Sequence, residues 1–266
     1  MRSVRPGLFA DDSIIRRVSR ENVLMLGGGR ALLMQLAHPK VAAGVDEHSD
    51  FRQRPLYRLR RTVWLTMAIV FGDRETALAA ARNVNRVHAR VKGRDYHALD
   101  PDLLLWVHAT LVDSALTTYE RFVHPLPARQ REDFYQQMNQ TAELLGVPHA
   151  KFPPTFKAFR DYVDEMIATE LRVGDAALEL SRLVLRPKVM RIPGAMFMPL
   201  ELITTGLLPA SLREQYRLSW GRVHARMFRL FTRALPLLIA VTPPVLRVWP
   251  LPGHNVRLSP DFLMTV

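Results

Sequence analysis

The sequence predicts an all-α fold, with many helices packed into one globular domain. Apolar residues recur at three- and four-residue spacing from Ser19 onward, and no run of alternating apolar and polar residues indicates a strand. Of the 266 residues, 48% are hydrophobic and 23% are charged, a composition typical of globular proteins. Because no polar or low-complexity linker divides the chain, we expect a single domain over residues 1–266.

The helices are expected near residues 20–37, 55–71, 74–92, 101–122, 127–145, 154–171, 174–185, 195–206 and 210–241. Asp100 offers a capping side chain before Pro101, which suits a first helical turn, and Asp73 is placed similarly. Three glycines, Gly27 to Gly29, lie inside the first segment, where each costs about 1 kcal/mol relative to alanine. We therefore expect the backbone there to kink or to approach another element closely.

Composition excludes several kinds of site and favours a cytoplasmic location. Without cysteine, the chain can form no disulfide, iron–sulfur cluster, thiolate zinc site or thiolate-ligated haem. No apolar run of signal-peptide length follows the N-terminus. The stretch 234–241 is interrupted by Pro236 and is far shorter than the roughly 20 residues that span a bilayer, so no transmembrane helix is predicted.

The formal net charge of +12 requires an anionic partner to be considered. The basic residues are spread along the chain and do not form one tract, so a solvated basic surface is favoured over nucleic-acid binding. Peripheral contact with an anionic membrane is a further hypothesis. The sequence predicts no particular oligomeric state.

His88 is the strongest candidate metal ligand. The chain contains no Glu-x-x-His pair, HExxH motif, GxSxG elbow or Walker loop, which leaves the histidines and arginines of the helices. His88 continues the apolar stripe of its helix, and a neutral imidazole there could ligate haem iron while Arg86, Arg90 and Lys92 pair with the propionates. Spacing alone favours the alternative, a core histidine that hydrogen-bonds a backbone carbonyl.

Arg58, Arg61 and Thr62 are spaced so that they share one helix face. That arrangement suits the anchoring of an anionic ligand group or a polar contact above a metal. Solvated arginines at the start of a helix are the simpler interpretation.

Three more histidines are candidates for the same site. His38 and His48 are expected on a connection, because Pro39 ends one helix and Gly44 marks a turn. His108 is the main competitor of His88 as an iron ligand, although its spacing favours a core histidine.

Several of these segments, taken in order, resemble the MpaB and latex-clearing-protein family of haem b oxygenases. The strings are GGGRALLMQLAHPKVAAGVDEHSDF, RLRRT, VFGD, VHARVKG and LLLWVHATLVDS, and the match is best over residues 21–167. The resemblance implies a helical fold that encloses a cofactor pocket for haem b, with His88 as the proximal iron ligand. It also implies that Arg58 and Thr62 lie near the haem, whereas the family's arginines around the proximal histidine are matched only loosely.

Arg61 departs from the family pattern. In the rubber-cleaving branch a lysine precedes the threonine and can occupy the other axial position of the iron. A guanidinium has no free lone pair with which to bind iron. The resemblance therefore implies an open or water-bound sixth position, or a distal residue such as His48 or His38, with Arg61 tuning the pocket electrostatically.

The activity implied by the resemblance is the use of dioxygen to oxygenate or cleave a small apolar substrate of isoprenoid or lipid type. Rubber itself is not expected, because the rubber-cleaving members are secreted and this sequence shows no export signal. The catalytic candidates are Arg58, Arg61, Thr62 and His48. The alternative is a non-catalytic helical protein that binds haem or lipid.

Overall fold

The predicted all-α fold is confirmed by the computed structural model, which describes residues 6–48, 55–187 and 194–249, and only the backbone of 55–60 and 194–195. In this part of the chain, isolated β-bridges such as Gly7 with Asp73 stand in place of strands. The prediction of one domain over residues 1–266 stays a prediction.

Most of the helices lie close to the predicted segments, but residues 14–19 form a helix that was not expected, and the predicted segment 20–37 divides into a 3-10 helix and an α-helix. The helices are α1 (Ile14–Ser19), the 3-10 helix η1 (Asn22–Gly27), α2 (Gly28–Leu36), α3 (Pro39–His48), α4 (Pro55–Phe71), α5 (Arg74–His88), α6 (Pro101–Phe122), α7 (Ala128–Leu144), the 3-10 turn η3 (His149–Lys151), α8 (Phe156–Thr169), α9 (Asp175–Leu185), the 3-10 turn η4 (Gly194–Phe197), α10 (Met198–Leu207), α11 (Ala210–Gln215), α12 (Arg222–Val241) and α13 (Pro244–Arg247). The predicted caps are confirmed, because Asp73 accepts a hydrogen bond from the Thr76 amide (2.8 Å) and Asp100 accepts one from the Asp102 amide (2.9 Å).

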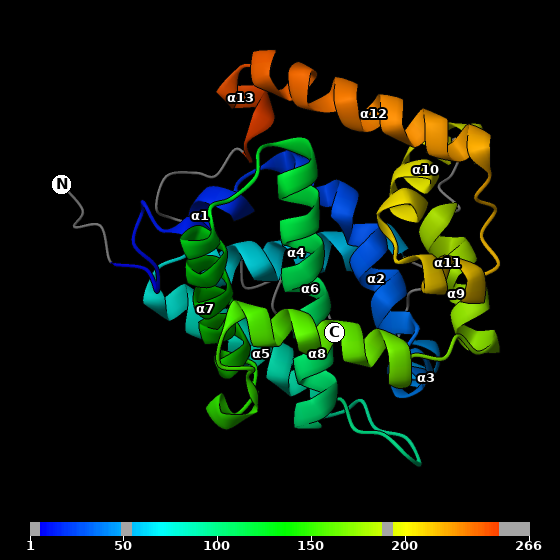
Figure 1. Ribbon diagram of the computed structural model, residues 1–266. Helices are drawn as coiled ribbons and strands as arrows, with labels where there is room; N and C mark the ends of the chain where they lie inside the picture. Colours follow the sequence, from blue (N-terminus) through cyan, green and yellow to red (C-terminus); the bar gives the residue numbers. More distant parts are fainter. Residues whose placement is uncertain (1–5, 49–54, 188–193, 250–266) are drawn as a thin grey trace.

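Helix α6 forms the centre of the molecule. Figure 1 shows it upright, with α2 and α7 to either side, α8 crossing its lower part and α12 crossing its upper end. Trp106, Tyr119 and Phe122 along α6 are almost completely buried. The large aromatic area removed from water along this helix makes it the principal hydrophobic support of the surrounding layer.

The expected close approach at the three glycines is confirmed. A Cβ atom at Gly27 would lie within 3.0 Å of the Thr118 side chain of α6, and one at Gly29 would lie within 3.0 Å of the Thr204 side chain of α10. A Cβ at Gly28 would meet nothing within 4 Å. Two of the three glycines therefore allow the start of α2 to pack directly against neighbouring helices.

These contacts lead to a matched pair of stability predictions. We expect Gly29→Ala to lower the free energy of unfolding by about 1–3 kcal/mol, because the new methyl group overpacks the contact with Thr204. Gly28→Ala is the control. We expect its free energy of unfolding to be unchanged or slightly higher, because the new methyl group enters open space and alanine favours the helix more than glycine does. Urea unfolding followed by circular dichroism measures both, and equal stabilities would contradict the packing argument.

Two predicted boundaries are wrong. Residues 39–48, expected to be a connection, form α3, because Pro39 occupies the first turn of a helix and does not end one. Gly44 lies inside α3, where the ring of Tyr96 packs so closely that a Cβ would lie 3.2 Å from it. The predicted helix over 74–92 ends at His88, which places Arg90 and Lys92 in the following turn.

The predicted segment 210–241 also divides, into α11 and α12. Between them the chain turns through Arg217, whose φ of 55° lies in the left-handed region. Helix α12 contains Pro236 and continues to Val241. In the described part of the chain, none of the helices combines the length and apolar character that crossing a membrane requires.

Residues 246–249, at the end of the last described segment, are hydrogen-bonded to residues 20–22. Arg247 donates two hydrogen bonds to the buried carboxylate of Glu21, at 2.7 and 2.9 Å. The Trp249 amide donates to the Arg20 carbonyl (3.0 Å), and the Asn22 side chain donates to the Leu246 carbonyl (3.1 Å). These contacts fix α13 against the beginning of η1.

Candidate functional site

The candidate haem-binding residues lie on the helix pair α4 and α5. A short connection through Gly72 and Asp73 joins the two helices, and Leu65, Ala68 and Ala80 pack between them. The end of the pair remote from the connection carries the first turns of α4 and the last turn of α5. Arg61 and Thr62 lie early in α4 and His88 is the last residue of α5, so each lies toward the end of its own helix that is remote from the connection.

His88 is the last residue of α5. Its side chain is half-buried, and its Nδ1 atom is buried. The His88 carbonyl accepts a hydrogen bond from the Val91 amide (3.0 Å), which begins the tight turn over residues 89–98. The buried face predicted for this imidazole is thus only partly realised, because the helix ends there.

The cations predicted to pair with haem propionates are close to His88 in the chain and lie on the surface. Arg86, Arg90 and Lys92 are all exposed. Arg86 lies in the last turn of α5, and the other two lie in the turn that follows. Long, exposed side chains of this kind can reach an anionic group near the end of α5.

His48 is brought to the same turn. Its Nε2 atom lies 3.0 Å from the carbonyl oxygen of Lys92, and its ring makes an edge contact with Tyr96. Tyr96 donates a hydrogen bond to Glu47 (2.7 Å). The C-terminal end of α3 is therefore docked on the turn that follows His88, which is consistent with a role for His48 near His88.

Of the three polar candidates near the start of α4, the side chains of Arg61 and Thr62 are described. The side chain of Arg58 lies outside the described residues, and only its place on α4 is given. Arg61 is half-buried and Thr62 is exposed. The Thr62 carbonyl accepts a hydrogen bond from the Thr66 hydroxyl (3.0 Å).

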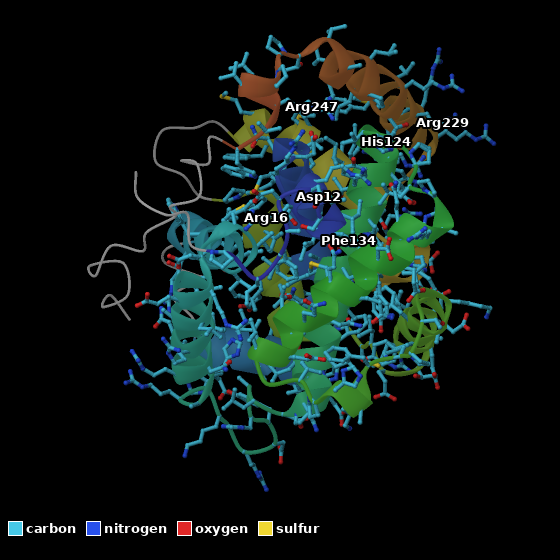
Figure 2. All side chains as sticks on the ribbon, turned by 90° about the vertical axis from the view of Figure 1, so that its left-hand side faces the viewer. Asp12, Arg16, His124, Phe134, Arg229 and Arg247 are labelled. Carbon is cyan, nitrogen blue, oxygen red and sulfur yellow. The ribbon has the colours of Figure 1, made fainter. Side chains whose placement is uncertain are left out.

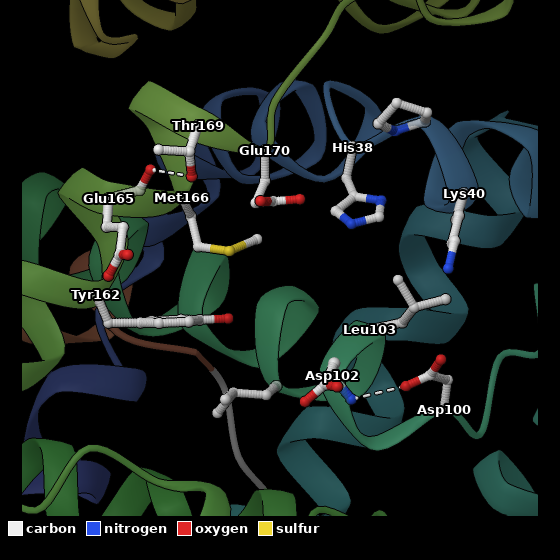
Figure 3. Close-up of a pocket in the computed structure, with 12 residues that line it drawn as sticks. His38, Lys40, Asp100, Asp102, Leu103, Tyr162, Glu165, Met166, Thr169 and Glu170 are labelled. Atoms are coloured by element: carbon white, nitrogen blue, oxygen red, sulfur yellow. Dashed lines mark hydrogen bonds between the residues drawn. The ribbon is translucent and has the colours of Figure 1, made fainter.

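His38 lies at the other end of α3, in a surface cavity of about 580 Å³. Figure 3 shows its ring beside Glu170, which directly follows α8, and across the cavity from Asp100 and Asp102 at the start of α6. Burial, followed by the charge of Lys40, lowers the pKa of His38. Neither His48 nor His88 is among the residues that line this cavity. His38 and His48, the two alternatives for the distal residue, therefore lie at opposite ends of α3.

His108 lies within the core. Its Nε2 atom is 3.1 Å from the Asn139 side-chain oxygen, and its ring meets Phe152 edge to face. Burial lowers the pKa of His108 to about 4, so the imidazole is neutral at neutral pH. The hydrogen bond with Asn139 favours the core interpretation that its spacing suggested.

A buried ion pair escaped the sequence analysis. Arg30 donates to Asp113 (2.6 Å), to the Ser114 hydroxyl (2.8 Å) and to the Leu207 carbonyl (2.8 Å), and Arg160 donates to the other oxygen of Asp113. Arg30 is 5% exposed and Asp113 is 2% exposed. The only signal in the sequence was Arg30 directly after the three glycines, where an arginine on a closely packed helix requires a buried partner.

In the described part of the chain, no group of three or more His, Asp or Glu side chains could hold a metal ion. A haem iron takes four of its ligands from the porphyrin and needs only one or two from the protein. The assignment of His88 as that ligand stays a prediction.

Comparisons with known proteins identify the family. No solved structure gives a significant match to the chain. Two proteins described as uncharacterized, from Mycobacterium tuberculosis and Mycobacterium bovis, are each 28% identical over 238 residues, covering 82% of this chain and 89% of the relative. The family model described as "ER-bound oxygenase mpaB/B'/Rubber oxygenase, catalytic domain" matches residues 15–237. The resemblance seen in the sequence is thereby confirmed, and the chain belongs to this family of oxygenase catalytic domains.

Proposed function

We propose that the chain is a haem b-dependent oxygenase in which His88 ligates the iron and a small apolar substrate is oxygenated or cleaved with dioxygen. The observation that carries the proposal is the match to an oxygenase catalytic domain over residues 15–237. Within that range, His88 ends α5, and the exposed cations Arg86, Arg90 and Lys92 lie within four residues of it in the chain.

The residues at this end fit the chemistry of a haem. An imidazole is a common protein ligand of haem iron, and His88 is half-buried at the end of α5. Arg86, Arg90 and Lys92 are exposed cations that would hold the propionates by charge-assisted hydrogen bonds. When bound, the haem would supply the activation of dioxygen, while the protein supplies ligation, pocket shape and polarity.

The distal roles follow from the chemistry of the side chains. Arg61 is permanently charged and would donate hydrogen bonds without ligating the iron. The Thr62 hydroxyl can donate and accept hydrogen bonds, so it would orient a polar group of the substrate. His48, held by the Lys92 carbonyl, would exchange a proton at its ring nitrogen.

The substrate class rests on the family description. That description includes rubber oxygenases, and natural rubber is an apolar chain of isoprene units. We carry over only the chemical class, a small apolar alkene of isoprenoid or lipid type.

The test is a haem titration followed by an oxygen measurement. We expect the purified protein to bind haem with a Soret band, and its reduced form to consume dioxygen when geranylgeraniol is added. A saturated alcohol of the same length is the control substrate and should leave oxygen consumption at the rate of slow autoxidation.

Two other outcomes would overturn parts of the proposal. A Soret band without alkene-dependent oxygen consumption would favour a non-catalytic haem- or lipid-binding protein. Absence of any Soret band after reconstitution would exclude haem chemistry and leave only the family and the helical fold.

A further inference from the structure

Helix α12 presents an apolar stripe to solvent. Val223, Met227, Leu230, Leu237 and Val241 recur at helical spacing, with Ala234 completing the stripe. These five side chains are between 48% and 77% exposed. A run of exposed large apolar residues along one helix face is uncommon on a monomeric protein and indicates an interaction surface.

The stripe is not needed to hold α12 in place. Another side of the helix carries Phe228, Phe231 and Leu235, which pack in a cluster with Phe122 of α6 and Ile203 of α10. Helix α12 therefore has an inner apolar face that binds the core and an outer apolar face that does not. Figure 1 shows the helix as the outermost layer at the top of the molecule.

An arginine stripe runs along one flank of the outer face. Arg222, Arg226, Arg229 and Arg233 are spaced at four, three and four residues, and all are exposed. Figure 2 shows Arg229 on the outer side of α12. Among the described residues, none of the four forms an ion pair, and the sequence contains no Asp or Glu between Glu214 and Asp261.

The surface continues beyond α12. Val245 and Leu246 of α13 are exposed, and the bond between Arg247 and buried Glu21 holds this helix in place. We group the exposed apolar stripe of α12 and these two exposed residues as one candidate surface. We call it the α12 face.

We propose that the α12 face binds the surface of an anionic phospholipid membrane. A helix with an apolar face and arginines along its border can lie in the plane of the interface, with its apolar side chains among the acyl chains. The arginines would then meet lipid phosphates, to which a guanidinium donates paired hydrogen bonds. The inference concerns the fold alone and does not depend on the proposed oxygenase activity.

A second copy of the chain is the competing occupant. The spacing of the apolar stripe also matches a coiled-coil seam. In an antiparallel pair of α12 helices, however, Arg226 and Arg233 of both copies would border the seam, and α12 offers no acidic residue to compensate their repulsion. An anionic bilayer offers acyl chains to the apolar stripe and phosphates to the arginines, so charge complementarity favours lipid over a second copy.

The test uses the full chain without added haem and vesicles made of equal parts phosphatidylcholine and phosphatidylglycerol. We expect co-sedimentation with these vesicles and little with phosphatidylcholine alone. Leu230→Glu combined with Leu237→Glu should abolish binding, because carboxylates replace two exposed members of the stripe. Arg226→Gln combined with Arg233→Gln should weaken binding by on the order of tenfold or more.

The control is Arg94→Glu, which changes the net charge by the same amount as either double variant. Arg94 is exposed in the turn that precedes α6, whereas α12 packs near Phe122 at the other end of α6. We expect this variant to bind vesicles like the parent, and circular dichroism should show equal helix content in all four proteins.

Four outcomes would overturn the proposal. The first is absence of parent binding to the anionic vesicles, and the second is unchanged binding by the leucine variant. The third is a dimer of the parent, detected by analytical ultracentrifugation, that the leucine variant loses while vesicle binding is absent. That result would assign the α12 face to a second copy. Binding by a chain ending at Trp249 but not by the parent would instead assign the face to residues 250–266.

Discussion

His88→Ala is expected to remove most of the haem that the parent protein retains, and to shift the Soret band of any haem that remains. Alanine has no lone pair to bind iron, so the cofactor would be held only by apolar contacts and by its propionates. The measurement is the ultraviolet–visible spectrum after haem reconstitution and gel filtration. Added imidazole should restore part of the parent spectrum, because it can replace the missing ligand in the space that alanine leaves.

The controls for this experiment are two other histidines. His149 is a surface residue whose side chain is 89% exposed, so His149→Ala should keep the parent spectrum. His108→Gln tests the competing ligand in the core. An unchanged spectrum in His88→Ala together with a lost Soret band in His108→Gln would transfer the ligand role to α6.

Asp113→Ala is expected to lower the free energy of unfolding by about 3–5 kcal/mol. The substitution leaves Arg30 buried with its charge uncompensated, although its hydrogen bonds to Ser114 and to the Leu207 carbonyl remain. Because a folded domain is stable by only about 5–15 kcal/mol, this loss should be visible as a large shift of the urea midpoint.

The matched control is Asp164→Ala. Asp164 is the other acidic partner of Arg160, at 3.5 Å, but its side chain is 68% exposed. An exposed ion pair contributes about 0–1 kcal/mol, so the control should unfold almost like the parent. Similar midpoints for the two variants would mean that water reaches Asp113 and that the pair is not the buried anchor described above.

The helices with clear local signals could be predicted from the sequence. The bounds of α4 and α6 agree with the predicted segments 55–71 and 101–122. Each helix has a proline in its first turn, and Gly72 follows the end of α4. Helix α3 was missed because the same kind of proline, Pro39, was interpreted as a stop, and because the close contact of Gly44 with Tyr96 joins residues far apart in the chain.

The candidate site was predictable only in part, for a similar reason. Periodicity places His88 on a helix face, but it does not show that α5 ends at this residue or that His48 reaches the following turn. His38 and His48 could not be told apart from the sequence. Helix α3 separates them by ten residues, or about 15 Å of helix, so only His48 meets the turn after His88. The pair of Arg30 and Asp113 spans 83 residues and leaves no periodic signal at all.

The bond between Glu21 and Arg247 has a consequence for how the protein is made. The hydrogen-bond partner of the Glu21 carboxylate is Arg247, which follows it by 226 residues in the chain. Arg247 is therefore synthesised after α1 to α12. Until Arg247 has been synthesised, Glu21 lacks the two hydrogen bonds that compensate the burial of its carboxylate. Synthesis from the N-terminus normally allows early segments to settle first. The contact between η1 and α13 can therefore form only after α12 and α13 have been synthesised.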